Sequence, residues 1–174
     1  MAKEHQLNIR LDSVIISIFN QIAKEMNLSP GTLGSKVITD FVQFYYYKIE
    51  RGDLTISQPI LKSILQYVNH DKIDDISKFQ ADYILSEIKA QEGTVTYDKL
   101  VTRAIKWNKG NHLIFNQIKQ NGSDIFVSKH SLGKQWSELQ CKTYSNLFEK
   151  IGETVLEREY DSDISFSLEI ARHE

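Results

Sequence analysis

The sequence predicts an α+β protein in three parts: a small strand-helix-helix module over residues 1–52, a helical connector over 53–110, and a C-terminal β-β-α-β-β domain over 111–174. The spacing of hydrophobic residues carries this prediction, because they alternate at both ends of the chain and recur every three or four positions between. A second observation is Asn121-Gly122, a pair typical of a tight β-hairpin turn.

The N-terminal module begins with an amphipathic strand. Apolar and polar side chains alternate along it, in the order Gln6, Leu7, Asn8, Ile9, Arg10 and Leu11. The spacing becomes helical after Asp12, a residue that favours the N-cap position, and predicts a helix of about fifteen residues. The turn residues 27–31 end that helix, and Pro30 suits the first turn of a second one. Gly52 is a plausible end of the second helix.

The rest of the chain divides into a helical part and a mixed part. Three amphipathic segments predict helices in the connector, at about 57–68, 74–92 and 97–108. The last third predicts two strands, a helix and two more strands, at about 113–119, 125–130, 134–151, 154–160 and 164–170.

Composition excludes several classes of protein. Hydrophobic residues make up 41% of the 174, which is enough for a core, but none of their runs approaches the roughly 20 needed to cross a bilayer. The first ten residues lack the apolar stretch of a signal peptide, so we expect a cytoplasmic protein without a membrane partner. Cys141 is the only cysteine, and the five histidines lack ligand spacing. We therefore expect no metal and no cofactor.

The amphipathic strand expected at the start of the chain has no neighbouring strand in the N-terminal module. Its edge groups would stay unpaired, and too little lies beside it to cover its apolar face. Antiparallel pairing with a second copy solves both problems and predicts an intertwined homodimer. The outer face of this ribbon presents Gln6, Asn8 and Arg10 twice, and a two-stranded ribbon fits the major groove of double-stranded DNA. Because Asn and Gln can bond adenine and Arg can bond guanine, these are the expected base contacts.

The stretch from Gln6 to Leu11 resembles the DNA-reading strand of ribbon-helix-helix repressors of the Arc and MetJ type, down to the Gln, Asn and Arg of its outer face. The second helix is also similar, with apolar residues and a basic one in corresponding places: Leu33, Lys36, Val37, Ile38 and Phe41. The resemblance covers about residues 5–50, under a third of the chain. It implies a dimeric transcriptional regulator.

The resemblance also implies contacts with the DNA backbone. In that family the turn before the second helix binds phosphate through N–H groups at the helix start. By position, the phosphate contacts here are Ser29, Gly31, Thr32 and Lys36. Pro30 removes one N–H from this array. Gly34 lies inside the helix, where it costs about 1 kcal/mol relative to Ala, and close helix packing in the dimer would explain it.

The net charge of −2 argues mildly against nucleic acid as a partner, but the distribution of charge along the chain softens that objection. Residues 1–51 hold six basic residues against five acidic ones, a net charge of +1, whereas residues 152–174 hold two against seven, a net charge of −5. A near-neutral module has to depend on a few well-placed groups and on dimer doubling. The alternative interpretation is that the polar face of the strand is only solvated and that the ribbon serves dimerisation alone.

Four aromatic residues follow one another at positions 44–47. For this run, we favour packing against other parts of the protein over stacking on nucleic-acid bases.

The C-terminal domain carries one candidate effector site. His130, Gly133, Lys134 and Trp136 follow a strand into a helix, and such a junction can hold an anion, although a simple structural turn around a core tryptophan is the stronger interpretation. Cys141 fits a buried, inert position, with redox sensing left open. No coherent catalytic set is present, so we do not expect an enzyme.

The sequence therefore predicts a sequence-specific transcriptional regulator, most simply a repressor, that binds double-stranded DNA as a homodimer or a dimer of dimers. Its C-terminal domain would sense an unknown small-molecule or protein effector, or extend the oligomer. Two alternatives stay open: an antitoxin-type DNA-binding protein that also binds a protein partner, and a dimeric interaction scaffold without DNA binding.

Overall fold

The computed structural model describes residues 7–171, apart from the side chains of Phe44, Tyr47 and Arg51. The chain divides into two compact units, Met1–Asp53 and Leu54–Glu174. The helices expected as a connector and the C-terminal strands thus belong to one unit. Each unit is described by itself.

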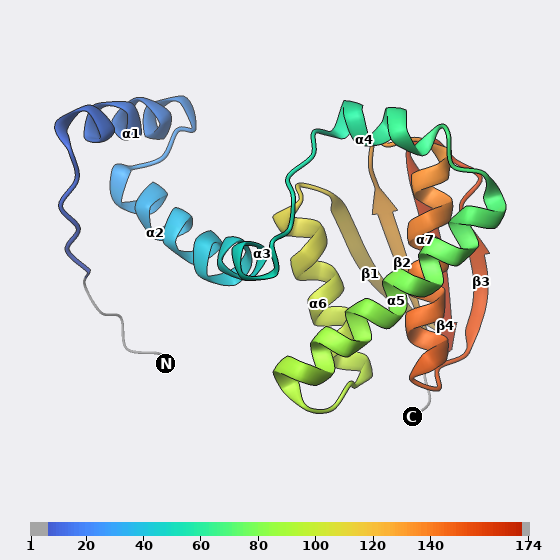
Figure 1. The fold of residues 1–174 in the computed structure, drawn as a ribbon. Coiled ribbons are helices and arrows are strands. Elements are labelled where there is room, and N and C mark those ends of the chain that lie inside the picture. Colours follow the sequence, from blue (N-terminus) through green and yellow to red (C-terminus); the bar gives the residue numbers. More distant parts are fainter. Residues whose placement is uncertain (1–6, 172–174) are drawn as a thin grey trace. The chain divides into compact units, whose positions relative to one another are not determined.

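The N-terminal unit is helical over its described residues (Figure 1). Its elements are α1 (Ser13–Glu25), α2 (Pro30–Asp40), the π-helical turn η1 (Phe41–Tyr45) and α3 (Tyr46–Arg51). The expected N-cap is present, because the Asp12 carboxylate accepts the backbone N–H of Val14 at 2.7 Å. The expected stop is present too, since Gly52 caps α3 with a φ of 69°.

The strand expected at the start of this unit is not present in the single chain. Residues 7–12 precede α1 without regular secondary structure, and Gln6 lies outside the described residues. A strand is defined by hydrogen bonds to a neighbouring strand, and no strand of this unit is described beside residues 7–12. The expected α+β class is confirmed, but the ribbon is not part of the fold of one subunit.

The C-terminal unit combines four helices with a four-stranded antiparallel sheet. Its elements are α4 (Gln58–Leu65), α5 (His70–Glu92), α6 (Tyr97–Gly110), β1 (Ile114–Gln120), β2 (Ser123–Lys129), α7 (Lys134–Lys150), β3 (Val155–Glu159) and β4 (Ser165–Ala171). Along the chain these last five elements follow one another as β-β-α-β-β, as expected. Within the sheet, the strand order is β1-β2-β4-β3. Asn121 and Gly122 both have positive φ, 48° and 79°, as the expected hairpin turn requires.

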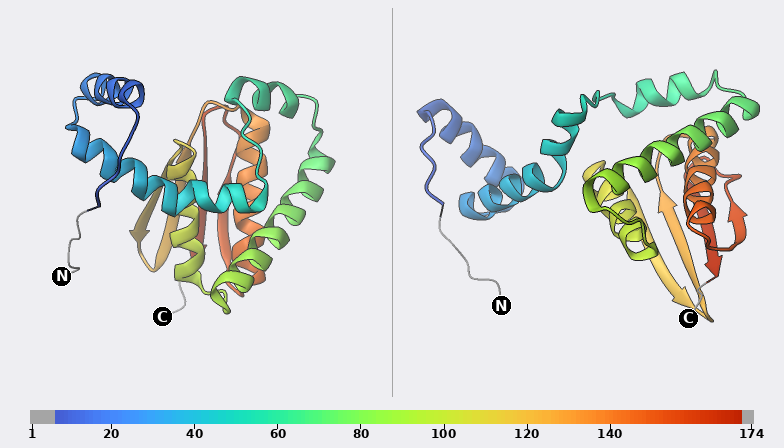
Figure 2. Two further views of the ribbon diagram at one scale, coloured as in Figure 1. Left: turned by 60° about the vertical axis from the view of Figure 1, so that its left-hand side comes forward. Right: turned by 60° about the horizontal axis from the view of Figure 1, so that its bottom comes forward.

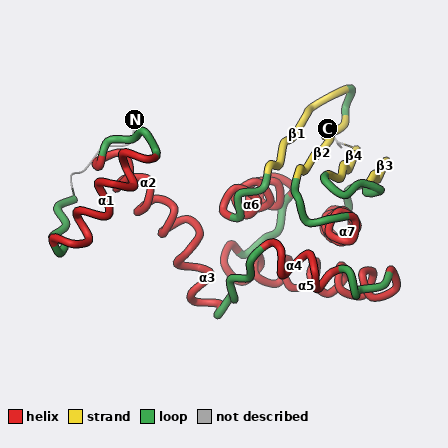
Figure 3. Tube along the Cα trace, turned by 90° about the horizontal axis from the view of Figure 1, so that it is seen from above, coloured by secondary structure: helices red, strands yellow, loops and turns green. Residues whose placement is uncertain are grey.

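This unit is built in layers (Figures 1, 2 and 3). One face of the sheet carries α6, which packs on β1, and α7, which packs on β4 and β3. The long helix α5 lies across the outer side of α7. The larger apolar core lies between sheet and helices and centres on stacked aromatic side chains, among them Phe126, Tyr144, Phe148 and Phe166. A second cluster surrounds Trp136 and Leu132 beneath α4.

The helix expected from about residue 74 begins earlier, at His70. Asn69 provides the reason, because its side-chain oxygen accepts the backbone N–H of Lys72 at 3.0 Å and so caps the first turn. Within residues 7–171, none of the helices combines the length and the hydropathy needed to cross a membrane.

Candidate nucleic-acid interface

The polar side chains expected to read bases stand on the segment before α1. Asn8 and Arg10 are both exposed, and Gln6 lies outside the described residues. The alternate side chains, Leu7, Ile9 and Leu11, are exposed as well. In the single chain, therefore, both the polar face and the apolar face of this segment are exposed. Exposure is favourable for the polar side chains and unfavourable for the apolar ones.

The helices of the N-terminal unit have almost no core of their own. Among its described side chains only Ala23 and Leu33 are buried, at 1% and 4% exposure. Large apolar side chains are exposed throughout: Leu7, Ile9, Leu11, Val14, Ile15, Ile16, Ile18, Ile22, Met26, Val37, Ile38, Phe41, Val42, Tyr45, Tyr46 and Ile49. A unit of this size cannot offset its chain entropy with two buried side chains. Most of the large apolar side chains described in this unit are exposed.

The backbone N–H groups expected to bind phosphate at the start of α2 are partly used within the helix itself. Ser29 is the N-cap: its hydroxyl accepts the backbone N–H of Thr32 at 3.0 Å and also lies 2.7 Å from the Thr32 hydroxyl. Pro30 lies in the first turn, where a missing N–H costs least. Gly31 is exposed, and a Cβ there would meet only the Ser29 hydroxyl, at 3.9 Å. Among the described residues no close contact requires a glycine at this position.

Lys36, the remaining expected phosphate contact, already has a partner within its helix. Its ammonium lies 2.9 Å from the Asp40 carboxylate, one turn later. Both side chains are substantially exposed, so this pair is weak and a phosphate could compete with Asp40. The positive charge of this surface therefore falls mainly to Arg10 and to the α2 N-terminus.

The four residues of the candidate effector site do not converge on one point. His130 is held by its neighbours: its Nδ1 accepts the backbone N–H of Leu132 at 3.2 Å, and its Nε2 lies 2.9 Å from the Ser137 hydroxyl. Burial lowers the pKa of His130 to about 4, so the ring is neutral at physiological pH. Trp136 points into the second core cluster, where its ring stacks on Trp107 with centroids 6.3 Å apart.

Gly133 and Lys134 lie where an anion was expected, but the chain supplies its own carboxylates. Gly133 has a φ of 92°, and a Cβ there would meet the Lys62 side chain at 3.5 Å. The backbone N–H of Lys134 donates to Asp163 at 3.1 Å, and the Lys134 ammonium pairs with Asp161. These two aspartates were not anticipated; the only signal in the sequence is the acidic pair Asp161-Ser162-Asp163 before the last strand.

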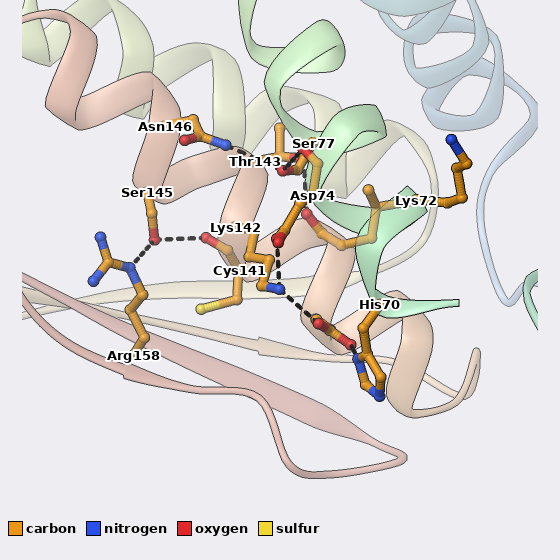
Figure 4. A network of polar contacts seen from close by, with 12 residues as sticks. His70, Lys72, Asp74, Ser77, Cys141, Lys142, Thr143, Ser145, Asn146 and Arg158 are labelled. Atoms are coloured by element: carbon orange, nitrogen blue, oxygen red, sulfur yellow. Dashed lines mark hydrogen bonds and ion pairs between the residues drawn. The ribbon is translucent and has the colours of Figure 1, made fainter. Parts of the chain in front are cut away.

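A second polar cluster, also not anticipated, joins α5 to α7 (Figure 4). The Lys142 ammonium lies between the carboxylates of Asp74, at 2.6 Å, and Glu138, at 2.7 Å, and His70 Nδ1 lies 2.6 Å from the other oxygen of Glu138. The hydrogen bond from Lys142 lowers the pKa of Asp74. Each carboxylate has a cationic partner, so this cluster links two helices. No group of three or more ligating side chains within residues 7–171 is arranged to hold a metal ion.

Comparisons with protein-family models, with curated proteins and with solved structures returned no match to this chain.

Proposed function

We propose that the chain is a homodimeric, sequence-specific DNA-binding transcriptional regulator that reads the major groove with a two-stranded antiparallel ribbon, one strand from each subunit. The observation that carries this proposal is the exposed apolar surface of the N-terminal unit, in which only Ala23 and Leu33 are buried among the described side chains. That surface includes the alternating side chains of Leu7, Ile9 and Leu11 and most of the apolar face of α1.

A second copy is the partner that this pattern favours. Two antiparallel copies of residues 6–11 satisfy each other's edge N–H and C=O groups, because the pairing is self-complementary. The apolar face of the resulting ribbon then covers the exposed faces of α1 and α2 from both subunits. Pairing of this kind would turn six polar side chains outward, namely Gln6, Asn8 and Arg10 of each subunit.

Recognition would combine base contacts with backbone contacts. Arg10 can donate two hydrogen bonds to guanine, and Asn8 and Gln6 can each make a bidentate pair with adenine. The N-terminus of α2, with Ser29, Gly31 and Thr32, offers backbone N–H groups and a partial positive charge to a flanking phosphate. A dimer has two such helix starts, which would fix the register of the ribbon on the duplex.

The C-terminal unit would regulate or extend this dimer. Its α5 carries an apolar stripe at helical spacing, Ile76, Phe79 and Tyr83, and Phe79 is 74% exposed. This stripe supports a further protein contact, either in a dimer of dimers or with a different protein. The second case is the antitoxin-type alternative, in which DNA binding is retained. The compact core of this unit favours a folded regulatory domain over an extended toxin-wrapping tail.

DNA selection with the purified full-length chain, at stated salt concentrations, tests the proposal. We expect an enriched site with two-fold symmetry, and an affinity that falls as salt rises because phosphate contacts release counterions. Substituting Gln6, Asn8 and Arg10 together with alanine should weaken binding to that site by at least about 100-fold, given about 1–3 kcal/mol for each bidentate base contact.

A matched control replaces three exposed polar residues of the sheet, Asn116, Gln120 and Lys129, with alanine and should bind the site normally. Sedimentation should find both variants dimeric. Equal DNA affinity in the ribbon variant would refute base reading by the ribbon, whereas the absence of any selected site would leave the interaction scaffold. A monomer at micromolar concentration would refute the ribbon itself.

A further inference from the structure

Three polar atoms in the core of the C-terminal unit have no hydrogen-bond partner in the described part of the chain. They are the hydroxyl of Ser128, the amide nitrogen of Gln140 and the indole nitrogen of Trp136. These residues are 1%, 3% and 7% exposed. Leaving such a group buried and unpaired costs about 1–3 kcal/mol, and buried polar atoms in folded proteins are paired in the great majority of cases.

The place of Ser128 in the core follows from the sheet register. Ser128 lies directly between Phe115 of β1 and Phe166 of β4. Both of these rings contact the ring of Tyr144 on α7, with centroids 5.3 and 6.0 Å apart. The Ser128 hydroxyl is therefore close to the part of α7 that includes Tyr144 and the turn before it.

Gln140 belongs to that same part of α7. Directly after β2, His130 Nε2 lies 2.9 Å from the Ser137 hydroxyl, so this end of β2 lies near the first half of α7. Within this half of α7, the thiol of Cys141 points toward β4, where it donates to a backbone oxygen at 3.5 Å. Gln140 lies four residues after Trp136 and four before Tyr144, whose rings contact Trp107 of α6 and Phe115 of β1, so Gln140 points toward the side of α7 on which α6 and β1 lie.

Trp136 lies one turn before Gln140 on the same face of α7. Its ring stacks on Trp107 of α6. The next residue of α6, Asn108, donates to the Tyr144 hydroxyl at 2.8 Å, so α6 closes this region from the side. The region thus has two N–H donors, from Trp136 and Gln140, and one hydroxyl that can donate or accept.

We propose that Ser128, Trp136 and Gln140 form a buried binding site, between α6, α7 and the β1–β2 hairpin, for a small neutral guest whose oxygen accepts hydrogen bonds. An oxygen acceptor is the chemistry that two N–H donors select. None of the three side chains carries a charge, and an anion buried without a cation would be costly, so the guest is neutral. It is a water molecule or the carbonyl or hydroxyl oxygen of a small compound. The proposal is independent of DNA binding.

Thermal unfolding of the full-length protein tests the site. Gln140→Met keeps the volume of the side chain and removes its amide, and Ser128→Ala removes the hydroxyl. Each should lower the midpoint by about 2–4 °C, because the bonds to the guest are lost. Gln135→Met is the matched control: it makes the same change on the same helix at a half-exposed residue and should leave the midpoint unchanged. An unchanged or higher midpoint in either core variant overturns the proposal, since groups without a partner have no bond to lose.

Two further measurements on the full-length protein identify the source of the oxygen. Native mass spectrometry of the protein as purified should find a non-covalent adduct, absent from Gln140→Met, if the guest is a small compound. If the guest is water, the spectrum should have no adduct, and nuclear Overhauser effects should link a long-lived water to the side-chain amide of Gln140. The absence of both signals also overturns the proposal.

Discussion

Asp163 caps a helix that begins 29 residues before it: its carboxylate accepts the backbone N–H of Lys134 at 3.1 Å, at the start of α7. The N-cap position of that helix is Gly133, which has no side chain to offer. The connection between β3 and β4 therefore supplies the cap, and it ties the end of the sheet to the helix that covers it. The same contact places the chain's own anion where an anionic effector was expected.

Replacing this carboxylate should weaken the C-terminal unit. Asp163→Ala should lower the free energy of unfolding by about 1 kcal/mol, the usual cost of losing a helix cap. Asp163→Asn should retain most of the stability, because an amide oxygen still accepts the N–H of Lys134. Denaturant unfolding of both variants provides the measurement. Equal losses in the two would mean that charge, and not the hydrogen bond, makes the contribution.

His130 should make the stability of the protein depend on pH. Burial lowers its folded-state pKa to about 4, below the ordinary value of 6.5, so the unfolded chain binds the proton more readily. Stability should therefore fall as the pH drops from about 6.5 to 4 and should level off below that range. The measurement is the difference in unfolding midpoint between the native protein and His130→Gln, which should narrow across this window. A constant difference from pH 7 to 4 would contradict it.

Gly34 should be required by the dimer and not by the single chain. Within one chain a Cβ at this position would meet Phe19 at 3.9 Å, an ordinary contact, and alanine favours a helix by about 1 kcal/mol. If a partner helix approaches closely there, Gly34→Ala should nevertheless raise the dimer dissociation constant about tenfold. Sedimentation equilibrium measures this constant. A tighter dimer would show that no helix approaches at Gly34.

Cys141 should be unreactive while the protein is folded. The side chain is fully buried, and burial raises the pKa of its thiol to about 12, so almost no thiolate is present at neutral pH. A disulfide exchange reagent should label less than a tenth of the folded protein in an hour and all of it in denaturant. Rapid labelling of the folded protein would support redox sensing, the alternative that the sequence left open.

Local patterns predicted most of the elements. The Asp12 cap, the Gly52 stop and the Asn121-Gly122 turn depend on residues a few positions apart, so each could be recognised from the sequence. The helical and alternating spacings located the other helices and the four C-terminal strands within a few residues, whereas the strand expected at residues 6–11 is not formed by the described residues 7–11 in the single chain. The start of α5 was placed too late because a cap at Asn69 was not recognised.

The candidate sites also depend partly on local patterns and partly on contacts between residues far apart in the sequence. The alternation of Leu7 with Asn8 can be read along the chain, but a strand also needs a neighbouring strand, and none is described beside residues 7–12 within the single chain. The residues around His130 were grouped by their order in the sequence, whereas the fold points Trp136 into the core and pairs Lys134 with carboxylates from a later loop.

The sequence by itself determined the α+β class, the order of the elements and their local caps, because those features depend on the spacing and conformational preferences of neighbouring residues. Only the tertiary structure decided that Asp163 caps α7, that Ser128 lies buried between Phe115 and Phe166, and that most large apolar side chains of the N-terminal unit are exposed. These relationships join residues that are far apart in sequence. They are set by which faces pack together, and burial can be judged only when the whole surface is known.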